Sequence, residues 1–455
     1  MNRKTRRAVR SSQSSRSQAT KNKSFLLNIK QKKGKRVEVD FNGGDITSNA
    51  GVLLLSSADK RLGLLKNIAN IFPDRREPSK IEHSMLSMLR QRVYGIALAY
   101  EDLNDHDAFR NDLALQTALN LEKTLASRST LSRLENTADR KIAWKIHEEI
   151  FKQFIKSFKT PPTELTLDFD ATDDLVHGRQ EKFFYNAHYE HECFLPLYVT
   201  CDKQLLVSYL RPSNVDGAKH TWAILSLFVK NLRKIWPDVK ITFRGDSGFC
   251  RHKMFNWCDK KNVDYVCGIP GNPVISRLSN LWTAWAHEYF DHTQEKQRIF
   301  GEFFYQAKGW SRSRRVIVKA EHMEKGANPR YVVTNRAEKP QELYEKIYCA
   351  RGEMENRIKE QQLDLFADRT SCMNWWPNQL RLLFSSLAYV LINAIREIAL
   401  EGTKFSALSS GSIRLKLFKI GAIILRNTRR IRFHLSSAYP DQLLFFEILS
   451  KLESG

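Results

Sequence analysis

Cysteine is scarce in this sequence, and its placement excludes a disulfide scaffold. The 455 residues include 7 cysteines, an odd number, and no two of them are spaced as Cys-x-x-Cys. Scattered thiols of this kind are typical of a reducing cytosol, where structural disulfides are rare. We therefore expect a cytoplasmic protein.

Long apolar segments are also absent. The longest apolar run, Leu382 to Ile395, is interrupted by Ser385, Ser386 and Asn393. It falls short of the roughly 20 apolar residues that cross a bilayer, so it predicts a buried helix. The basic N-terminus is not followed by an apolar core with a small-residue cleavage site, which excludes a secretory signal. We expect no membrane partner.

Acidic residues are missing from the first 36 positions, where Ser, Gln and basic residues predominate. Such a segment buries too little apolar surface to fold alone, so residues 1–36 are predicted to be a disordered basic arm. The whole chain has a formal net charge of +23 and a pI near 9.7. A charge this far from neutral indicates a polyanionic partner, with nucleic acid ahead of an anionic membrane surface. We expect a nucleoid-associated protein.

Apolar residues, by contrast, are plentiful enough for several packed cores. The hydrophobic content is 42% over 455 residues, which predicts roughly two to four structural units. Residues 37–160 show apolar residues at helical spacing and predict a helical DNA-binding region. Within it, Leu125 to Leu134 resembles a turn and recognition helix whose Arg128 and Arg133 face phosphates. A plain helical bundle fits the same pattern.

The sequence pattern changes at Pro161-Pro162, after which apolar and polar residues alternate instead of recurring at helical spacing. Glu164 to Asp170 places Leu165, Leu167 and Phe169 on one face and carboxylates on the other, as a strand does. Further strands and helices follow in the order β-β-α-β-α-β, so residues 161–271 predict the first part of a mixed-sheet α/β core. The helical stripe that includes Trp222 is expected to face this core.

Three further segments complete the chain. Residues 272–340 carry three strand patterns separated by glycine turns and predict a β-rich insertion. Residues 341–400 predict the second part of the core, with two helices. Residues 401–455 form a basic C-terminal region with Arg414, Lys416, Lys419, Arg426, Arg429, Arg430 and Arg432.

Carboxylates stand where strand ends and a helix are predicted to meet. Asp170 ends the first core strand, and Asp246 lies in a Gly-Asp-Ser-Gly turn after a later strand. Open α/β sheets bind ligands beyond strand ends. On the later helix, residues three and four apart put Tyr348, Arg351 and Lys359 on one face around Glu355.

The three acids suit phosphodiester chemistry. Two Mg²⁺ ions about 3.5–4 Å apart, held by carboxylate oxygens, activate the nucleophilic oxygen and stabilise the leaving oxygen of a phosphodiester. Asp170 would bridge the ions, and Asp246 and Glu355 would each complete one site. Arg351 and Lys359 would neutralise phosphate oxygens. A salt-bridged helix surface fits the helix taken alone.

Two acids compete with this assignment. Asp168 shares a strand face with Asp170 and remains an alternative, whereas Glu353 points away from the Arg351 face. Asp173 and Asp174 are expected to be solvated.

These motifs resemble those of the DDE transposases of bacterial insertion sequences. The similarity is to the group with a Tyr-Arg-Glu-Lys signature, and is strongest to insertion-sequence family thirteen-eighty. It rests on three ordered segments and on shorter stretches, namely Leu167–Asp174, Arg244–Phe249, Tyr348–Lys359, Val176–Gly178, Leu210–Asn214, Ile413–Leu417 and Ser436–Pro440. Where related signatures have a lysine seven residues after the glutamate, this chain has Gln362.

The resemblance implies an RNase H-like core, dependence on Mg²⁺ for which Mn²⁺ can substitute, and cut-and-paste transposition. It implies a homodimer acting on double-stranded DNA, both the terminal inverted repeats and the target. By motif position Asp170, Asp246 and Glu355 are the catalytic acids, and Tyr348, Arg351 and Lys359 contact phosphate. Gln362 puts one phosphate contact in doubt.

Two other functions remain open at this point. An RNase H-like nuclease would cleave without joining, and a basic DNA-binding protein would carry acids with structural roles only.

Two clusters allow further interpretations. His177, His188, His191 and Cys193 are zinc-ligand types, but no second pair lies nearby, which favours structural or DNA-contact roles. Trp310, flanked by basic residues, would stack on an unpaired base or lie on the insertion surface.

Overall fold

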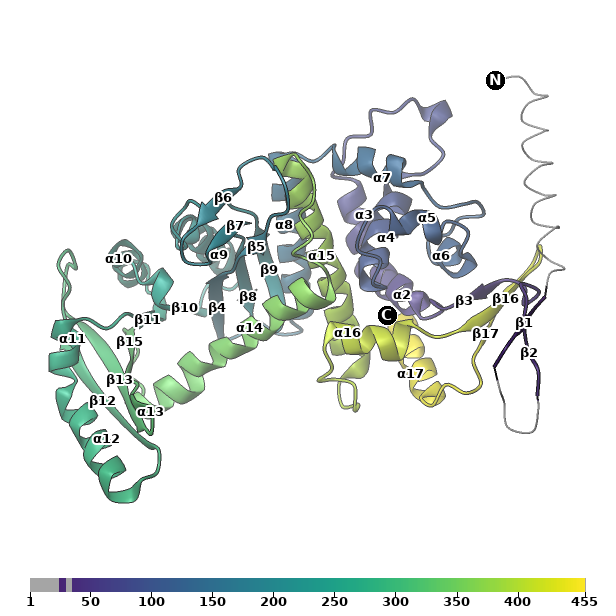
Figure 1. Cartoon of the computed structure of the whole chain (residues 1–455). Coiled ribbons are helices and arrows are strands. Elements are labelled where there is room, and N and C mark those ends of the chain that lie inside the picture. Colours follow the sequence, from purple (N-terminus) through teal and green to yellow (C-terminus); the bar gives the residue numbers. More distant parts are fainter. Residues whose placement is uncertain (1–23, 30–34, 455) are drawn as a thin grey trace.

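The computed structural model describes residues 24–29 and 35–454. Figure 1 shows an elongated molecule with a large sheet toward one end and a helical region toward the other. Most of the arm predicted to be disordered lies outside the described residues. In the described part of the arm, β1 (Phe25–Leu27) forms an antiparallel pair with β2 (Val37–Val39), which follows the arm. The prediction is wrong for residues 25–27, because this apolar triplet finds a strand partner.

The helical region near the N-terminus consists of short helices around one long one. Asp139 caps the long helix by accepting a hydrogen bond from the Ile142 backbone N–H at 2.7 Å, and Gly63 ends the first helix at a φ of 65°. The elements are β3 (Ile46–Thr47), α2 (Val52–Leu62), α3 (Leu64–Ala69), η2 (Pro78–Lys80), α4 (Met85–Ala97), α5 (Asp105–Ala108), α6 (Leu113–Ala118), α7 (Arg128–Glu135) and α8 (Arg140–Ser157).

A nine-stranded mixed sheet forms one half of the molecule, which confirms the predicted mixed α/β class. Its order is β12-β13-β15-β11-β10-β4-β8-β9, with β14 paired to β13. The neighbours β4, β10 and β11 are parallel to one another. β8 runs antiparallel to both of its neighbours, β4 and β9. The strands of the first part are β4 (Glu164–Ala171), β8 (Leu197–Cys201), β9 (Gln204–Tyr209), β10 (Lys240–Gly245) and β11 (Asp264–Ile269). A small sheet of β5 (Asp174–Leu175), β7 (His191–Phe194) and β6 (Phe184–Asn186) follows β4.

Two helices link these strands and cover one face of the sheet. They are α9 (Thr221–Ile235) and α10 (His252–Lys260), and Leu225, Phe228 and Phe255 of these helices belong to the core beneath them. The expectation that Trp222 joins this stripe is wrong, because its side chain is 53% exposed. Trp222 lies in the first turn of α9, where the neighbouring Thr221 is the buried residue.

The strands of the predicted β-rich insertion continue the nine-stranded sheet. Two helices precede these strands. α11 (Pro273–Leu278) and α12 (Asn280–Thr293) precede the strands β12 (Gln297–Tyr305), β13 (Arg314–Met323), β14 (Gly326–Ala327) and β15 (Arg330–Thr334). The three longer strands lie where they were predicted. β15 pairs antiparallel with β11, so the backbone ladder passes without interruption from the core into this segment. The helices were missed because the aromatic residues of α12 favour strand as much as helix.

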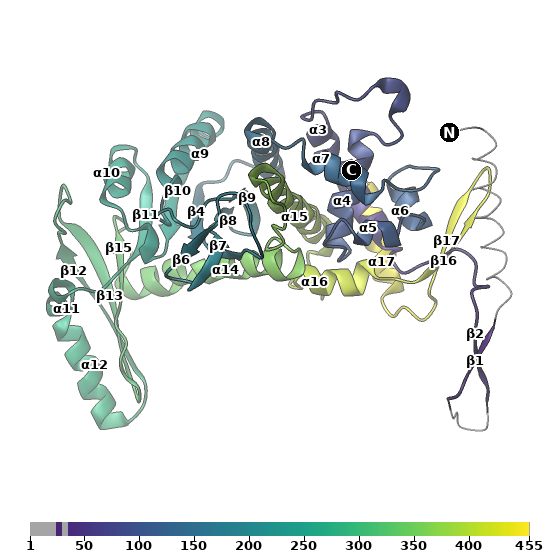
Figure 2. The same ribbon diagram turned by 45° about the horizontal axis from the view of Figure 1, so that its top comes forward.

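The later helix runs along the sheet (Figure 2) and is made of several joined segments. After α13 (Pro340–Glu342) come the π-helical η4 (Leu343–Tyr348), the 3₁₀ turn η5 (Cys349–Arg351), α14 (Gly352–Lys359) and the π-helical η6 (Glu360–Asp364). Leu343 and Tyr344 of η4 pack on Val266 and Val332, on the sheet face opposite α9 and α10. The sheet is therefore covered on both faces at this point.

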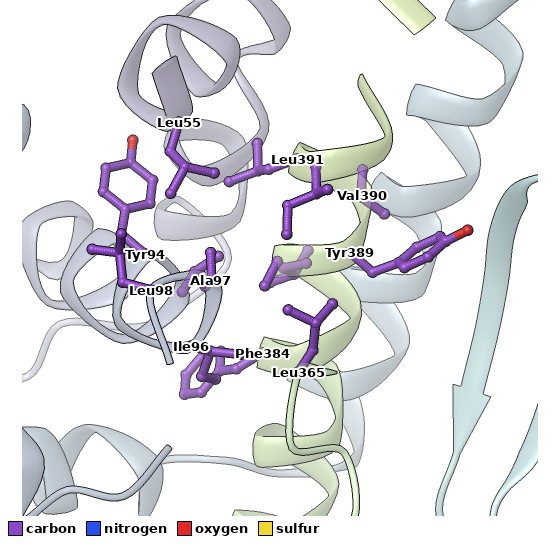
Figure 3. Packing of buried hydrophobic residues seen from close by; sticks show 14 of the residues in the cluster. Leu55, Tyr94, Ile96, Ala97, Leu98, Leu365, Phe384, Tyr389, Val390 and Leu391 are labelled. Atoms are coloured by element: carbon purple, nitrogen blue, oxygen red, sulfur yellow. The ribbon is translucent and has the colours of Figure 1, made fainter. Parts of the chain in front are cut away.

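The apolar run that predicted a buried helix is α15 (Trp375–Ile395), followed by the π-helical η7 (Arg396–Leu400). Within the described residues, one helix, Trp375–Leu400, has the length and composition of a membrane span, and 83% of its most apolar window is buried inside the protein. Figure 3 shows Phe384 and Leu391 of α15 packed against residues of α2 and α4. The other side of α15 packs on β9. The helix thus joins the two halves of the molecule.

The C-terminal residues are part of the N-terminal helical core, contrary to the separate region expected over residues 401–455. β16 (Ala422–Arg426) pairs with β17 (Ile431–Leu435) and with β3, and α17 (Gln442–Glu453) packs on α2. α16 (Ser410–Ile413) and η8 (Arg414–Phe418) precede them. Arg414 is 8% exposed and donates to the Ala97 carbonyl at 2.8 Å. Its basic side chain bonds backbone carbonyls, which the charge pattern alone did not indicate.

Candidate active site

Two carboxylates meet at one edge of the sheet because their strands are parallel neighbours. Phe169 of β4 lies opposite Gly245 of β10 in the register, so Asp170 and Asp246 are each the next residue along. Asp170 is largely buried, with a side chain 14% exposed, and Asp246 is half-buried. The sequence predicted this pairing from the two strand ends, and the structure places the residues as expected.

The turn after β10 leaves room for the Tyr348 side chain to lie against it. The Asp246 side chain accepts a hydrogen bond from the Gly248 backbone N–H at 2.8 Å and begins the turn η3 (Ser247–Phe249). A Cβ on Gly268 of β11 would lie 2.8 Å from both the Ser247 nitrogen and the Tyr348 hydroxyl oxygen. Only glycine leaves room there, so Gly268 lets Tyr348 reach the turn that carries Asp246.

Glu355 is connected to the strand carboxylates through Arg351. The Arg351 guanidinium donates from Nη1 to Asp170 Oδ2 at 3.0 Å and from Nη2 to Glu355 Oε1, four residues along α14. The bridge fixes the helix over the strand edge. Glu355 itself is 44% exposed, so its carboxylate also faces solvent.

Negative charge accumulates at this edge. Burial raises the pKa of the Asp170 carboxyl to about 7, an effect that Arg351 opposes and that Asp246 and Glu355 reinforce. Burial also raises the pKa of the Tyr348 phenol. One arginine thus serves as counter-ion for a group of three acids, which leaves the site short of positive charge.

The acids are of the chemical type that a hard divalent cation takes. Carboxylate oxygens are the ligands that Mg²⁺ prefers, and the cluster of acids around one cation is the charge pattern such an ion relieves. Within the described ranges, no three His, Cys, Asp or Glu side chains are near enough to hold a metal ion together. The Arg351 guanidinium lies between Asp170 and Glu355 where a cation would otherwise be shared.

Asp168, the alternative to Asp170, binds a buried arginine instead of facing the site. It is 2% exposed, and both of its oxygens accept hydrogen bonds from Arg244, the second at 2.7 Å. Arg244 also donates to the Ile347 carbonyl of η4. This buried pair joins β4, β10 and the later helix behind the site, so Arg244 positions Tyr348 and Arg351. Sequence reasoning missed Arg244, although it opens the Arg-Gly-Asp-Ser-Gly motif.

Comparison with known families decides the class of this site. Residues 29–454 match the family described as transposase DDE domain group 1. The chain belongs to this family. Membership implies nuclease and transesterification chemistry in general, and divalent metal ions as its usual cofactors. It confirms the broad resemblance drawn from the motifs.

Other comparisons add little. No curated protein matches the chain. Among solved structures, the cryo-EM structure of the piggyBac transposase synaptic complex with hairpin DNA is similar at 13% identity, with a TM-score of 0.39. The alignment covers 81% of this chain and 78% of that one.

Of the other residues predicted to contact DNA, Arg128 and Arg133 lie away from the acids, whereas Lys359 lies near Glu355. Arg128 and Arg133 are exposed on α7; Arg128 pairs with Asp107 at 3.4 Å, and Arg133 donates to Thr130 at 3.1 Å. Lys359 is exposed at the end of α14, one turn after Glu355. It is on the predicted face.

Trp310 does not fit the predicted base-stacking role. Its side chain is 9% exposed and packs edge-on against Phe255 and Tyr305, with ring centroids 6.0 and 5.5 Å away. The Arg314 guanidinium lies over the Trp310 ring, 5.8 Å from its centroid. The flanking basic residues suggested an exposed site, but one of them covers the ring.

The two acids after Asp170 differ from expectation. Asp174 is 1% exposed and accepts a hydrogen bond from Thr370 at 2.8 Å, so the prediction that it is solvated is wrong. Asp173 is half-buried, and its Oδ2 lies 2.9 Å from His191 Nε2. His191 therefore contacts a carboxylate.

Proposed function

We propose that this protein is a DNA transposase that binds the terminal inverted repeats of an insertion sequence. It would catalyse metal-dependent strand cleavage and strand transfer in a cut-and-paste reaction. The observation that carries the proposal is the meeting of Asp170 and Asp246 at adjacent ends of parallel strands, with Glu355 joined to them through Arg351.

The strand order supports an RNase H-like core. From one edge the order is β9-β8-β4-β10-β11, in which β8 runs antiparallel to the other four strands, and the first and fourth strands in chain order lead to the acids. On this proposal β12, β13 and β15 extend that core on the side of β11. The Tyr348, Arg351, Glu355 and Lys359 spacing supports assignment to the Tyr-Arg-Glu-Lys group and to insertion-sequence family thirteen-eighty.

Asp170, Asp246 and Glu355 would hold two Mg²⁺ ions, for which Mn²⁺ can substitute. When bound, these ions supply charge for the attacking and leaving oxygens of a phosphodiester. The chain's own residues have separate tasks. Asp170 is buried and feels the charge of both other acids, so its carboxylate would serve both ions. Glu355 is half exposed, so its carboxylate would lie on the side that the DNA backbone approaches.

Arg351 has two alternative partners in this mechanism. In the free protein its guanidinium is shared between Asp170 and Glu355. Once cations neutralise those acids, the same planar fork is free to bind two oxygens of one phosphate. Lys359 adds a point charge one turn further along, and Tyr348 places a hydroxyl beside the turn of Asp246.

The protein would act as a homodimer on double-stranded DNA, both element ends and target, in the nucleoid of the cytoplasm. The net charge of +23 supports a polyanionic partner.

Three isosteric substitutions test the triad: Asp170→Asn, Asp246→Asn and Glu355→Gln. Each should lower cleavage and joining of linear DNA bearing the element's ends at least about a thousandfold, because each removes a ligand of the metal ions. Binding of the same DNA, measured in Ca²⁺, should be unchanged. The matched control is Glu353→Gln on the same helix, exposed and paired with Arg357.

Other outcomes would identify other functions. Hydrolysed ends without recombinant products would indicate a nuclease that does not join. Salt-sensitive binding that is indifferent to Mg²⁺, with no cleavage by the wild type, would indicate a DNA-binding protein. Full activity of the Asp246→Asn variant would refute the triad.

A further inference from the structure

A basic hairpin projects from the molecule far from the candidate active site. It consists of β16, β17 and their turn, residues 422–435, and is called the basic hairpin below. Figures 1 and 2 both show it extending beyond the helical region, on the side opposite the sheet and α12. Neither the family match nor the acid triad assigns it a role.

The turn of the basic hairpin is held in one shape by Asn427. The Asn427 side-chain oxygen accepts hydrogen bonds from the backbone N–H groups of Arg429 and Arg430, both at 2.9 Å. The Asn427 N–H donates to the Arg430 carbonyl at 3.0 Å. The two arginine side chains therefore start from a fixed backbone, which lowers the entropy lost when they bind a partner.

The charge of the hairpin is uncompensated at its tip. Residues 422–435 include four arginines and no acid. Arg426 pairs with Glu122 at 3.2 Å, but the described part of the chain provides no ion-pair partner for Arg429, Arg430 or Arg432. All four side chains are exposed.

One face of the hairpin is also apolar and exposed. The register puts Ile423 opposite Ile46 of β3, and Leu425 opposite Arg432. Ile423, Leu425 and Ile46 are 46%, 54% and 62% exposed. Apolar side chains between arginines suit a surface that meets sugars and phosphates together, because sugars are less polar than the backbone that links them.

Charged residues also protect edge strands from aggregation, and Arg432 on the edge strand β17 serves that purpose. Arg429 and Arg430 lie in the turn beyond the strand ladder, where there is no edge to protect. Their charge calls for another explanation.

The base of the hairpin is fixed to the body. The Ile424 N–H donates to the Asp45 carbonyl at 2.8 Å, and the Ser436 N–H donates to the Gly421 carbonyl at 2.9 Å. Ile424 and Ala422 are buried in the same core as α2, α4 and α15. The base of the hairpin therefore has a fixed position on the helical core.

We propose that the basic hairpin is a DNA-docking element that enters a groove of the duplex, with Arg429 and Arg430 at its tip. The major groove, about 12 Å wide, admits a two-stranded ribbon. Arg426 and Arg432 flank the ribbon and contact phosphates. The inference rests on the proposed function in that DNA is the partner, but assigns binding to a surface remote from the acids.

The experiment compares three full-length proteins by fluorescence anisotropy. They are the wild type, the double variant Arg429→Ala/Arg430→Ala, and the control Arg277→Ala/Arg330→Ala. Arg277 of α11 and Arg330 of β15 are exposed, and this pair removes the same charge at the opposite end of the molecule. The probes are a duplex copied from the noncoding DNA beside the coding region and a scrambled duplex of equal length.

The hairpin variant should bind the flanking duplex at least tenfold more weakly than the wild type, with an unchanged Tm. The dependence of log K on log salt should become shallower, since two cations that displace counterions from the duplex are removed. The control should keep wild-type affinity. Unchanged binding by the hairpin variant, or equal loss in the control, would overturn the inference.

Two further outcomes separate this inference from its alternatives. Wild-type protein that binds DNA through the hairpin yet never cleaves it would refute the transposase proposal and leave the hairpin assignment intact. Binding of the wild type to phosphatidylglycerol vesicles, lost in the hairpin variant while DNA affinity stays the same, would make the hairpin a membrane contact and overturn it.

Discussion

Gln362 donates a hydrogen bond from its side-chain amide to the backbone carbonyl of Asp173, 2.9 Å away. The donor lies on η6, directly after the helix of Glu355, and the acceptor lies three residues after Asp170. The position that departs from the signature is thus a link between the two elements that carry the first and third acids.

Replacing Gln362 with alanine should loosen that link. We expect Gln362→Ala to destabilise the protein by about 0.5–1.5 kcal/mol, the usual net value of one hydrogen bond. DNA cleavage should fall while DNA affinity stays unchanged, because the residue positions the site. Thermal unfolding and anisotropy check this, with the exposed Gln341→Ala as control. A loss of DNA affinity at unchanged stability would make Gln362 a phosphate contact instead.

Breaking the buried pair behind the site should cost far more. Asp168→Asn leaves the Arg244 guanidinium buried without its carboxylate, and we expect a loss of about 3–5 kcal/mol. The control, Asp216→Asn, breaks an exposed pair with Arg251 and should cost no more than about 1 kcal/mol. Urea unfolding measures both. Equal stabilities would show that Asp168 is not a structural acid.

Trp310 should behave as a core residue. Trp310→Ala empties a site between Phe255 and Tyr305, for which we expect a loss of about 3–5 kcal/mol. Trp285→Ala on α12, where the side chain is 44% exposed, should change stability by at most about 0.5 kcal/mol. A Trp310 variant of normal stability that binds DNA weakly would restore the base-stacking interpretation.

Asp174 should make stability depend on pH. Burial raises the pKa of its carboxyl to about 8, with Asp368 and Asp173 adding to the shift and the Thr370 hydroxyl opposing it. The folded protein therefore holds a proton that the unfolded chain releases, so stability falls as pH rises from about 4 to about 8.

The test is Asp174→Asn, which keeps an acceptor for Thr370 but cannot ionise. Its Tm should equal that of the wild type near pH 4 and exceed it at pH 8, by the equivalent of about 1–3 kcal/mol. Asp216→Asn should follow the wild-type profile over this range. Parallel profiles for the wild type and Asp174→Asn would show that Asp174 does not titrate there.

Local patterns predicted the strands well because alternation is a property of a few neighbouring residues. The strand expected at Glu164–Asp170 is β4, and Asp170 and Asp246 followed from strand ends that parallel neighbours share. The helix face of Tyr348, Arg351 and Glu355 followed from helical spacing.

Long-range partners were not predictable. Asp174 is buried because Thr370, 196 residues later, supplies its hydrogen bond. Arg351 donates a hydrogen bond to Asp170 across 181 residues, so no local pattern indicated that the expected phosphate contact pairs with an acid. Trp310 is covered by Arg314, whose charge had suggested exposure. Charge patterns show which residues are basic, but not which of them bond within the protein.

The shared core of the two ends of the chain has a consequence for biosynthesis. Leu54 and Leu55 of α2 pack in one cluster with Ile448 and Leu452 of α17. Those partners are synthesised after the whole catalytic sheet, so the core around α2 stays incomplete while the sheet is made. Termination before α17 would therefore leave apolar surface of α2 uncovered.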